Sequence, residues 1–495
     1  MKKRDIASAV IDYTDYPNKG VFHVEETGEK GYVKNVIPGQ EVLFRVTKKH
    51  GDQVWGNRIE VLKKSPLETR KELCDHFGNC GGCLYQTVPY EKQLELKTEQ
   101  LQKLLKPILE PDSVFDGILC APREFGYRNK LDLSFGDEVP GGPLNLGMHK
   151  TGTRYTVLDA ESCVLAHEDL RTILSAVRDY CRTADLPFYN KLKHLGYLRY
   201  LMLRRSETSG EILMVLAVSS QMEHDFTPLV EQLLNLKLEG AITGIHLAIC
   251  DRYADALLPD ELHVLWGKDY FYEELLGLRF KVTLFSFFQT NTKGAEMLYA
   301  QVREYLRYGW KEENREDPGK QPVVYDLYCG TGTIAQIVAS EARQVYGIEL
   351  IPEAVEAAKL NAEMNGLWNC GFVAGDVPLL LETLPEKPDF VILDPPREGV
   401  HEKALRQIND YGIRHMVYIS CKATSFVRDM IYLRREGWQV ARYALADLFP
   451  GTQHIESCVL LERVSNRKAD SYVKLNVKME DYYRIKDSKG GEDNG

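Results

Sequence analysis

The sequence has no apolar run that approaches the ~20 residues needed to span a bilayer. Its first residues, Met1 to Arg4, are mostly basic and are followed at once by Asp5, without the apolar core of a signal peptide. Both absences exclude a membrane as a partner and favour a protein that stays in the cytoplasm. The sequence also shows no internal repeat at the spacing of solenoid proteins.

The chain lacks an excess of basic charge, since 62 lysines and arginines stand against 72 aspartates and glutamates. The formal net charge of −10 argues mildly against nucleic acid as a partner, although phosphates are contacted by local patches. The 11 cysteines are an odd total for 495 residues. In a reducing compartment we expect no disulfide framework, so clustered cysteines indicate metal or catalytic sites.

The chain divides into regions of different pattern, and its predicted fold class is multidomain α/β. Residues 1–64 hold short strands between turn signals, which predicts a small OB-like β-barrel. Residues 65–280 mix strands and helices and include an amphipathic helix over 89–106 that is suited to pack on the C-terminal region. Residues 281–464 alternate β and α segments, as in a doubly wound, Rossmann-like sheet. Residues 465–495 form a polar tail with one candidate edge strand.

The best-defined motif is the turn from Asp326 to Thr333, which joins a β-branched strand to a helix and follows a polar linker over residues 309–321. Gly330 and Gly332 allow the backbone to come close to a ligand at the carboxyl end of the strand. The turn lacks the third glycine of the dinucleotide fingerprint. It also lacks the Gly-Lys-Ser/Thr that binds a triphosphate.

Acidic residues close the next two strands. Glu349 stands 23 residues after Asp326, where such folds place a carboxylate for ribose hydroxyls, and Asp376 can face an adenine. Acidic flanks suit a cationic sulfonium cofactor better than a pyrophosphate. We therefore predict S-adenosylmethionine as the cofactor, with a generic nucleotide fold as the alternative.

Two further segments place reactive side chains at the same predicted sheet edge. A buried strand ends in the motif Asp394-Pro395-Pro396-Arg397, whose carboxylate can bind the cofactor and a substrate base. The next strand ends at Cys421, and Glu456 opens the last strand. A thiolate that adds to C6 of a pyrimidine makes C5 nucleophilic enough to take a methyl group, and a base must then remove the C5 proton. Cys421 is the candidate nucleophile and Glu456 the candidate base. Taken singly, Cys421 is more readily explained as an inert buried thiol, and the alternative for Glu456 is a solvated surface carboxylate.

A cysteine cluster precedes the central region. Cys74, Cys80 and Cys83 stand at the spacing C-x5-C-x2-C, among glycines that let the backbone wrap a metal. Cys163 is the candidate fourth ligand. Four thiolates fit a structural zinc ion or a [4Fe–4S] cluster equally well on their chemistry, so the spacing leaves the metal open.

In this order the motifs resemble the uridine-C5 RNA methyltransferases that modify 23S ribosomal RNA and tRNA. The resemblance runs from about residue 6 to Arg463. Besides the motifs already described, it is carried by Gly126-Tyr127-Arg128-Asn129-Lys130, Phe287-Phe288-Gln289-Thr290-Asn291, Ser420-Cys421 and His454-Ile455-Glu456.

The resemblance implies an RNA-binding TRAM barrel at the N-terminus and a [4Fe–4S] cluster on the four cysteines. It implies that Cys421 is the nucleophile and Glu456 the base. The cofactor-binding positions that it implies are Gln289, Tyr328, Glu349 and Asp394.

The chain departs from the family pattern at two places. The segment from Asp15 to Gly20 replaces a more glycine-rich opening of the barrel. After the nucleophile, Lys422-Ala423 stands where the family usually has Asn-Pro. Lys422 is placed to contact an RNA phosphate, and neither departure touches a residue assigned to chemistry.

The predicted reaction is methyl transfer to C5 of a uridine, in 23S rRNA by the resemblance, in a loop or at a flipped nucleotide. Alternatives are a tRNA uracil-C5 enzyme, an RNA cytosine-C5 enzyme, and a non-catalytic RNA-binding or iron–sulfur redox-sensing protein. A cytosine enzyme typically has a second cysteine after Asp-Pro-Pro, where this chain has Arg397 and Glu398. An intact Cys421 and Glu456 argue against the non-catalytic alternative.

A basic and aromatic segment of the central region suits single-stranded RNA, where bases stack and phosphates pair. The alternation of Leu198, Tyr200 and Met202 fits an ordinary sheet strand equally well. The basic and aromatic residues of the segment are Lys191, Lys193, His194, Tyr197, Arg199, Tyr200, Arg204 and Arg205.

Overall fold

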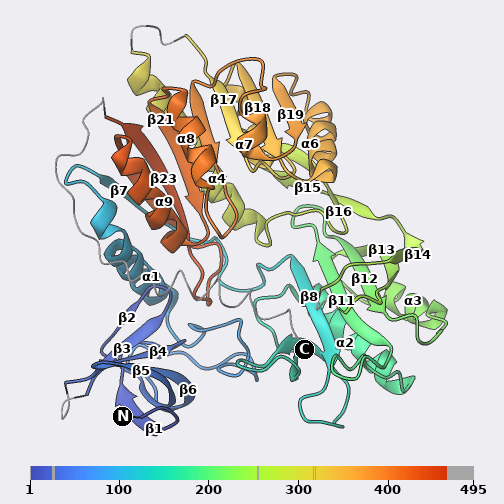
Figure 1. Ribbon diagram of the computed structural model, residues 1–495. Coiled ribbons are helices and arrows are strands. Elements are labelled where there is room, and N and C mark those ends of the chain that lie inside the picture. Colours follow the sequence, from blue (N-terminus) through green and yellow to red (C-terminus); the bar gives the residue numbers. More distant parts are fainter. Residues whose placement is uncertain (1, 25–27, 254–255, 316, 318, 465–495) are drawn as a thin grey trace, which may run out of the picture.

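The computed structural model describes residues 2–24, 28–253, 256–315, 317 and 319–464. The predicted edge strand of the tail lies outside these residues. Within them, every helix is too short or too polar to cross a bilayer. The fold is mixed α/β, with three large sheets and a two-stranded ribbon (Figure 1).

The N-terminal sheet contains six strands in the order β1-β5-β6-β4-β3-β2. Their alternating side chains enclose a small apolar core in which the rings of Phe22 and Phe44 lie 5.0 Å apart. The sequence pattern predicts strands at residues 21–24, 31–33, 39–46 and 55–61, and these are confirmed as β3 to β6, whereas β1 and β2, which are partly exposed, gave no clear pattern. The strands are β1 Ile6–Val10, β2 Tyr13–Asp15, β3 Lys19–His23, β4 Lys30–Lys34, β5 Glu41–His50 and β6 Gln53–Lys63.

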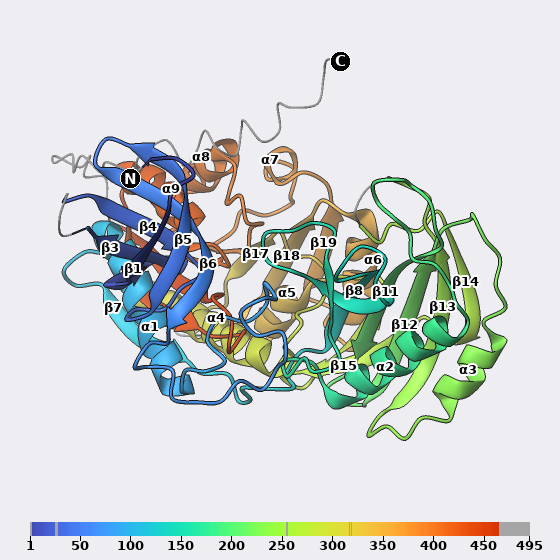
Figure 2. The ribbon, with the colours of Figure 1, turned by 90° about the horizontal axis from the view of Figure 1, so that it is seen from below.

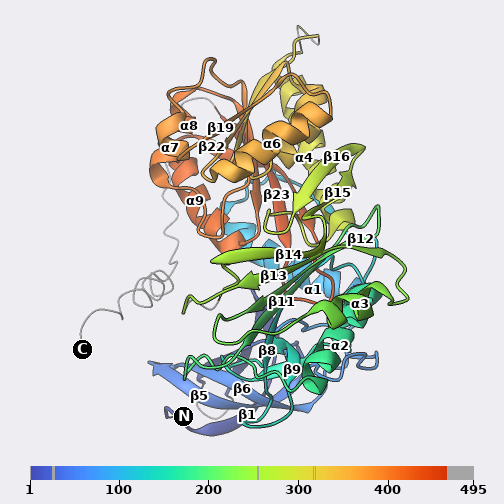
Figure 3. The same ribbon diagram turned by 90° about the vertical axis from the view of Figure 1, so that its right-hand side faces the viewer.

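A seven-stranded sheet follows in the order β10-β9-β8-β11-β12-β13-β14. Helices α2 and α3 cover one of its faces, and the opposite face packs toward β15 (Figures 2 and 3). The elements are β8 Lys130–Gly136, β9 Asn145–His149, β10 Val157–Asp159, α2 Glu168–Thr183, β11 Leu198–Arg205, β12 Glu211–Val218, α3 Thr227–Leu234, β13 Ala241–Ile249 and β14 Glu261–Gly267.

The burial of β11 decides between the two interpretations of the basic and aromatic segment. All residues of the strand are buried. Arg204 Nη1 donates to the carbonyls of Thr283 at 2.8 Å and Ser286 at 2.7 Å, and Arg205 Nε lies 2.9 Å from Asp169 Oδ2. Arginines that satisfy internal acceptors are not available to RNA phosphates. For this strand the RNA-binding prediction is wrong, and the sheet-strand alternative is correct.

The C-terminal sheet has eight strands in the order β19-β18-β17-β20-β21-β23-β22-β7. The five strands from β19 to β21 are parallel, and α4 to α6 cover one face while α7 to α9 cover the other, which confirms the Rossmann-like prediction. The elements from β15 onward are β15 Tyr270–Leu275, β16 Leu278–Thr283, α4 Thr292–Glu313, β17 Val323–Leu327, α5 Thr333–Val338, β18 Gln344–Glu349, α6 Pro352–Met364, β19 Cys370–Ala374, α7 Val377–Leu380, β20 Phe390–Leu393, α8 Glu402–Asp410, β21 His415–Ser420, α9 Ala423–Arg435, β22 Trp438–Ala446 and β23 Glu456–Arg463.

The predicted linker over residues 309–321 is wrong for its first part, because α4 continues to Glu313. Gly309 suggested a break in the helix. It instead allows close packing, since a Cβ at this position would lie 3.1 Å from the Phe390 ring and 3.2 Å from His415.

Part of the predicted central region belongs to the C-terminal sheet. β7, Val114–Leu119, is its edge strand and pairs in parallel with β22. Before it, α1, Tyr90–Leu105, lies between the N-terminal sheet and α9 (Figure 1). The expected separation of leucines from charges on this helix fails at Lys97, which is buried and holds its Nζ 2.7 Å from the buried Asp447 Oδ1.

Candidate functional site

One cavity of about 1500 Å³ opens at the carboxyl ends of the parallel strands. Parallel strands bring these ends to one edge of the sheet, so residues far apart in the sequence meet there. The cavity is larger than the roughly 300–1,000 Å³ of ordinary small-molecule sites, which leaves room for a cofactor and a base. Its lining includes every residue predicted for catalysis or cofactor binding: Gln289, Tyr328, Gly330, Glu349, Asp376, Asp394, Cys421 and Glu456.

The turn after β17 is held in shape by two carboxylates. Asp326 Oδ2 accepts the N–H of Ala335 at 2.8 Å, and Glu349 Oε2 accepts the N–H of Gly330 at 3.0 Å. Gly332 has a φ of 73°, and a Cβ there would lie 2.6 Å from an aromatic ring, so only glycine fits. The turn therefore presents its backbone to the cavity.

The acidic lining of the cavity fits a cationic ligand. Asp394 lines the cavity, whereas Asp326 is fully buried and is not part of the lining, and its Oδ1 has no hydrogen-bond partner among the described residues. Loss of hydration raises the pKa of Asp326 well above its ordinary value and the pKa of Asp394 to about 6. The positively charged sulfonium of S-adenosylmethionine would compensate the negative charge of these carboxylates.

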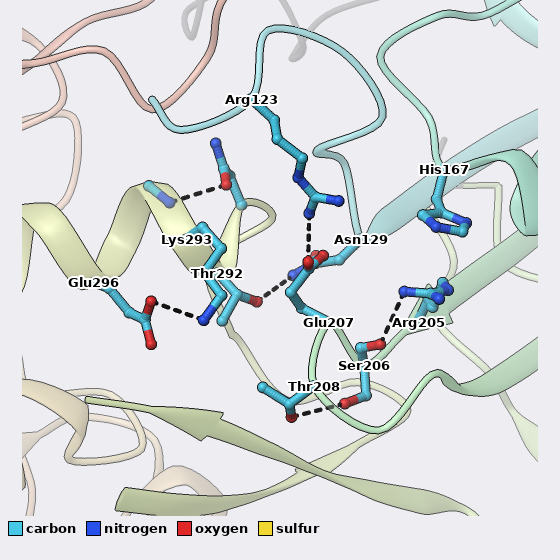
Figure 4. A network of polar contacts seen from close by, with 12 residues as sticks. Arg123, Asn129, His167, Arg205, Ser206, Glu207, Thr208, Thr292, Lys293 and Glu296 are labelled. Carbon is cyan, nitrogen blue, oxygen red and sulfur yellow. Dashed lines mark hydrogen bonds and ion pairs between the residues drawn. The ribbon is translucent and has the colours of Figure 1, made fainter. Parts of the chain in front are cut away.

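The loop that carries Gln289 is held in place by hydrogen bonds from Asn129, at the start of the central sheet. Figure 4 shows Asn129, which lies just before β8, pointing toward Thr292 at the start of α4. Its Nδ2 donates to the Thr292 hydroxyl at 2.9 Å and to the carbonyl of Gln289 at 3.1 Å. Its backbone N–H donates to the carbonyl of Thr290 at 3.0 Å. The motif around Asn129 thus fixes the loop that carries Gln289.

Cys421 lies in the short turn between β21 and α9 and is partly buried at the cavity wall. Its pKa is raised to about 11, first by loss of hydration and then by the carboxylates of Glu456 and Asp394, against the opposing charge of Arg397. A positive charge beside these carboxylates would lower the pKa of the thiol and favour the reactive thiolate.

Glu456 begins β23 next to Cys421, the predicted nucleophile. Ser457 pairs with Ser420 across β23 and β21, so Glu456 and Cys421 adjoin at the ends of neighbouring strands. Loss of hydration and the charge of Asp394 raise the pKa of Glu456 to about 8. A carboxylate with this pKa is an effective proton acceptor near neutral pH. The alternative of a solvated surface carboxylate is therefore wrong.

The loop that leads to Glu456 is anchored by residues that the sequence analysis missed. Lys97 pairs with Asp447 at the start of the loop. Asn291 donates from Nδ2 to the carbonyl of Leu448 at 2.7 Å while its Oδ1 accepts the first-turn N–H of Gly294 at 3.0 Å. Asn291 was recognisable as a helix N-cap residue. Lys97 carried no signal, because a lysine on an amphipathic helix is ordinarily solvated.

The four predicted metal ligands line a second cavity, of about 190 Å³, beside Arg128. Loss of hydration raises the pKa of Cys83, and the thiols of Cys163, Cys80 and Cys74 raise it further, so the four lie close together. Within the described part of the chain, however, no group of three or more such side chains is arranged to hold a metal ion. Arg128 also lines the large cavity, so the two cavities adjoin.

Two family models match the C-terminal part of the chain. Residues 324–410 match a methyltransferase domain, and residues 386–464 match the tRNA (Uracil-5-)-methyltransferase family. An uncharacterized RNA methyltransferase of Clostridium acetobutylicum is 41% identical over 463 residues, which cover 94% of this chain and 99% of that protein. Another, from Clostridium tetani, is 43% identical over 453 residues, which cover 92% and 96%.

Among solved structures, the chain is similar to the Pyrococcus abyssi tRNA (uracil-54, C5)-methyltransferase in complex with S-adenosyl-L-homocysteine. The TM-score is 0.70 at 22% identity, over 92% of this chain and 100% of that one. This likeness shows the shared fold, and the relatives show the family. The chain therefore belongs to the S-adenosylmethionine-dependent RNA methyltransferases that carry the uracil-C5 methyltransferase domain.

Proposed function

We propose that the protein transfers a methyl group from S-adenosylmethionine to C5 of a uridine in RNA through a covalent bond between Cys421 and C6 of the base. One observation carries this proposal: the pairing of Ser420 with Ser457 sets the thiol beside the Glu456 carboxyl at the wall of the cofactor cavity. A nucleophile and a base in adjacent positions are what C5 substitution of a pyrimidine requires.

In the proposed reaction the Cys421 thiolate adds its sulfur to C6, which breaks the C5–C6 double bond and makes C5 electron-rich. C5 attacks the methyl carbon of the sulfonium, and neutral S-adenosylhomocysteine leaves. The Glu456 carboxylate removes the C5 proton. The freed electron pair re-forms the C5–C6 double bond and expels the thiolate, so one proton is released for each methyl group transferred.

The cofactor contacts are part of the same proposal. Glu349 accepts the ribose hydroxyls, Asp376 faces the adenine, and Asp394 lies beside both the sulfonium and the base. The proposed cofactor residues are Gln289, Tyr328, Gly330, Glu349, Asp376 and Asp394, all of which line the large cavity.

We propose 23S rRNA as the substrate, on the resemblance of the whole motif set, with tRNA as the second candidate. The tRNA candidate is favoured by the substrate named for the Pyrococcus abyssi enzyme. In either RNA the target base has to leave its stack to reach Cys421, which favours a loop or a flipped nucleotide.

The N-terminal sheet is proposed as a TRAM barrel that binds this RNA. The rings of Tyr32 and Trp55 stack with their centroids 5.5 Å apart. Lys19 Nζ lies 4.0 Å from the centroid of Tyr32, and Lys48 Nζ lies 5.2 Å from that of Trp55. Stacked rings bordered by lysines suit the bases and phosphates of single-stranded RNA.

The [4Fe–4S] cluster also stays a proposal. A zinc ion would hold all four sulfurs about 2.3 Å from one point, whereas an iron–sulfur cluster holds its cysteines around a larger inorganic core. The thiols of Cys74, Cys80, Cys83 and Cys163 line one cavity, which supports a shared site, and the family resemblance favours the cluster over zinc.

Protein purified without oxygen is expected to contain about four irons per chain, measured by metal analysis and visible absorption. Cys163→Ser should lose this iron because it removes one ligand. Cys120→Ser is the matched control, since this exposed cysteine lies outside the cavity, and it should keep the iron. Stoichiometric zinc without iron would contradict the proposal.

Incubation with 5-fluorouridine-substituted RNA and S-adenosylmethionine should trap a covalent adduct, because C5 then carries no proton for Glu456 to remove. The adduct is measured on denaturing gels, in separate reactions with 23S rRNA and with tRNA. Cys421→Ala should form no adduct, and the control Cys120→Ser should form it in full. An equal yield from Cys421→Ala would reject the nucleophile, and an adduct on tRNA alone would make tRNA the substrate.

The raised pKa of Glu456 makes the stability of the protein depend on pH. Between the ordinary value of 4.5 and about 8, the folded state holds a proton that the unfolded state releases, so stability falls as pH rises through this range. Glu456→Gln should therefore stabilise the fold by about 1–3 kcal/mol at pH 9 and by little at pH 4, measured by denaturant unfolding.

A matched control for Glu456→Gln is Glu462→Gln on the same strand. Glu462 forms a partly exposed ion pair with Arg414, and its replacement should change stability by less than about 1 kcal/mol at either pH. If Glu456→Gln gave the same small effect as this control at pH 9, the buried, proton-holding carboxyl assigned here would be wrong.

A further inference from the structure

The two-stranded ribbon, in which β15 pairs with β16, lies between the central sheet and α6 (Figures 1 and 3). One face of the ribbon is buried and includes Phe271, Phe280 and Val282. The side chains of the other face alternate with these and are partly or fully exposed. This outer face of the ribbon consists of Tyr270, Tyr272, Glu274, Arg279, Lys281 and Thr283.

Both edges of the ribbon are fixed by side chains of its neighbours. Ser206 Oγ donates to a carbonyl of β15 at 3.0 Å. On the other edge, the N–H of Lys281 donates to Asn361 Oδ1 at 2.8 Å, and Asn365 exchanges hydrogen bonds of 2.9 Å with the N–H and carbonyl of Arg279. Because the edges are already hydrogen-bonded, a partner has to bind the side chains of the outer face and does not add a strand.

Two cations of the outer face lie over tyrosine rings. The guanidinium carbon of Arg279 lies 3.7 Å from the centroid of Tyr272, and Lys281 Nζ lies 4.2 Å from that of Tyr270. Among the described residues neither cation forms an ion pair, although Glu274 stands opposite Arg279 in the register. A ring attracts a cation through its π face and takes up none of the hydrogen bonds that a carboxylate would. Both cations are therefore held in place while their N–H donors stay available to an anion.

The outer face continues into the large cavity. Lys281 and Thr283 line that cavity, and so does Phe285, which follows them and is exposed. Arg279 stands two residues before Lys281 on the same strand, which spaces the two cations about 6.6 Å apart along the ribbon. A row of cations that leads to a base-binding cavity fits the phosphates of the nucleotides next to the bound base.

We propose that the outer face of the ribbon binds the RNA backbone beside the target uridine, with Arg279 and Lys281 each contacting a phosphate and Tyr272 and Tyr270 holding the cations in place. This inference rests on the proposed function, because the ligand is the RNA that places its uridine in the cavity. It adds a second RNA-binding surface, apart from the N-terminal sheet (Figures 1 and 3).

The test measures equilibrium binding of a short, fluorescent, uridine-containing single-stranded RNA to the full chain over a range of salt concentrations. Each phosphate contact with a single strand contributes about 0.7 to the magnitude of the slope of log K against the logarithm of salt concentration. The double variant Arg279→Gln/Lys281→Gln should therefore lower this magnitude by about 1.4. Its loss of affinity relative to the wild type should be greatest at low salt.

The matched control, Arg343→Gln/Lys387→Gln, removes the same charge from the amino ends of the parallel strands, far from the cavity. Arg343 directly precedes β18 and pairs with Glu386, and Lys387 lies shortly before β20. This control should keep the wild-type slope.

A third variant separates the ring from the charge. Tyr272→Leu keeps both cations but removes the ring over which Arg279 lies. Because the phosphate contacts remain while the guanidinium is held less firmly, the slope should stay the same and the affinity should fall by roughly twofold to fivefold.

Thermal unfolding and S-adenosylhomocysteine binding check that each variant is folded. If the double variant did not fold, Arg279→Gln and Lys281→Gln should each lower the slope by about 0.7. An unchanged slope for the ribbon variants, or an equal loss in the control, would overturn the proposal.

This binding test does not depend on methyl transfer. If the slope fell as expected but the wild type methylated no RNA, the proposed function would fail while the binding surface stood. If the wild type methylated RNA but the slope did not change, the binding surface would fail while the proposed function stood.

Discussion

Burial of carboxyl groups around one cavity is the constraint on which the site depends. Asp326 is buried, and Asp394 and Glu456 are partly buried, and loss of hydration raises the pKa of each. Buried carboxyl groups with raised pKa values destabilise a fold, and such groups cluster at sites where they act on a ligand. Two of these carboxylates also raise the pKa of Cys421. In our account a cationic cofactor relieves the carboxylates and favours the thiolate together, so cofactor binding prepares the nucleophile.

The turn after β17 and the proposed catalytic pair, Cys421 and Glu456, could be predicted from the sequence because their signals are local. Glycines after a β-branched strand, a carboxylate at the end of the next strand, and Cys421 at a strand end are each visible within a few residues. A parallel sheet then brings these ends to one edge without further information. All eight predicted catalytic and cofactor residues accordingly line one cavity.

What the sequence could not predict are pairings across long separations. Lys97 pairs with Asp447, 350 positions away in the sequence, and β7 pairs with β22 although the whole central sheet lies between them in the sequence. Neither has a local pattern, because a buried lysine and a short edge strand look like surface features. For the arginines of β11 the sequence pattern was misleading, because basic and aromatic residues suggest RNA binding even when their side chains are buried in a sheet. Helix α1 joins these parts through its polar side chains. Lys103 and Gln100 bind the turn between β2 and β3, and Lys97 pairs with Asp447 at the start of the loop that leads to Glu456.

Release of the C5 proton is the step that separates this account from methylation at any other atom. RNA that carries tritium at C5 of its uridines, incubated with enzyme and S-adenosylmethionine, allows released tritium and transferred methyl groups to be counted together. The account predicts one tritium released to water for each methyl group transferred. Methyl transfer without tritium release would contradict it.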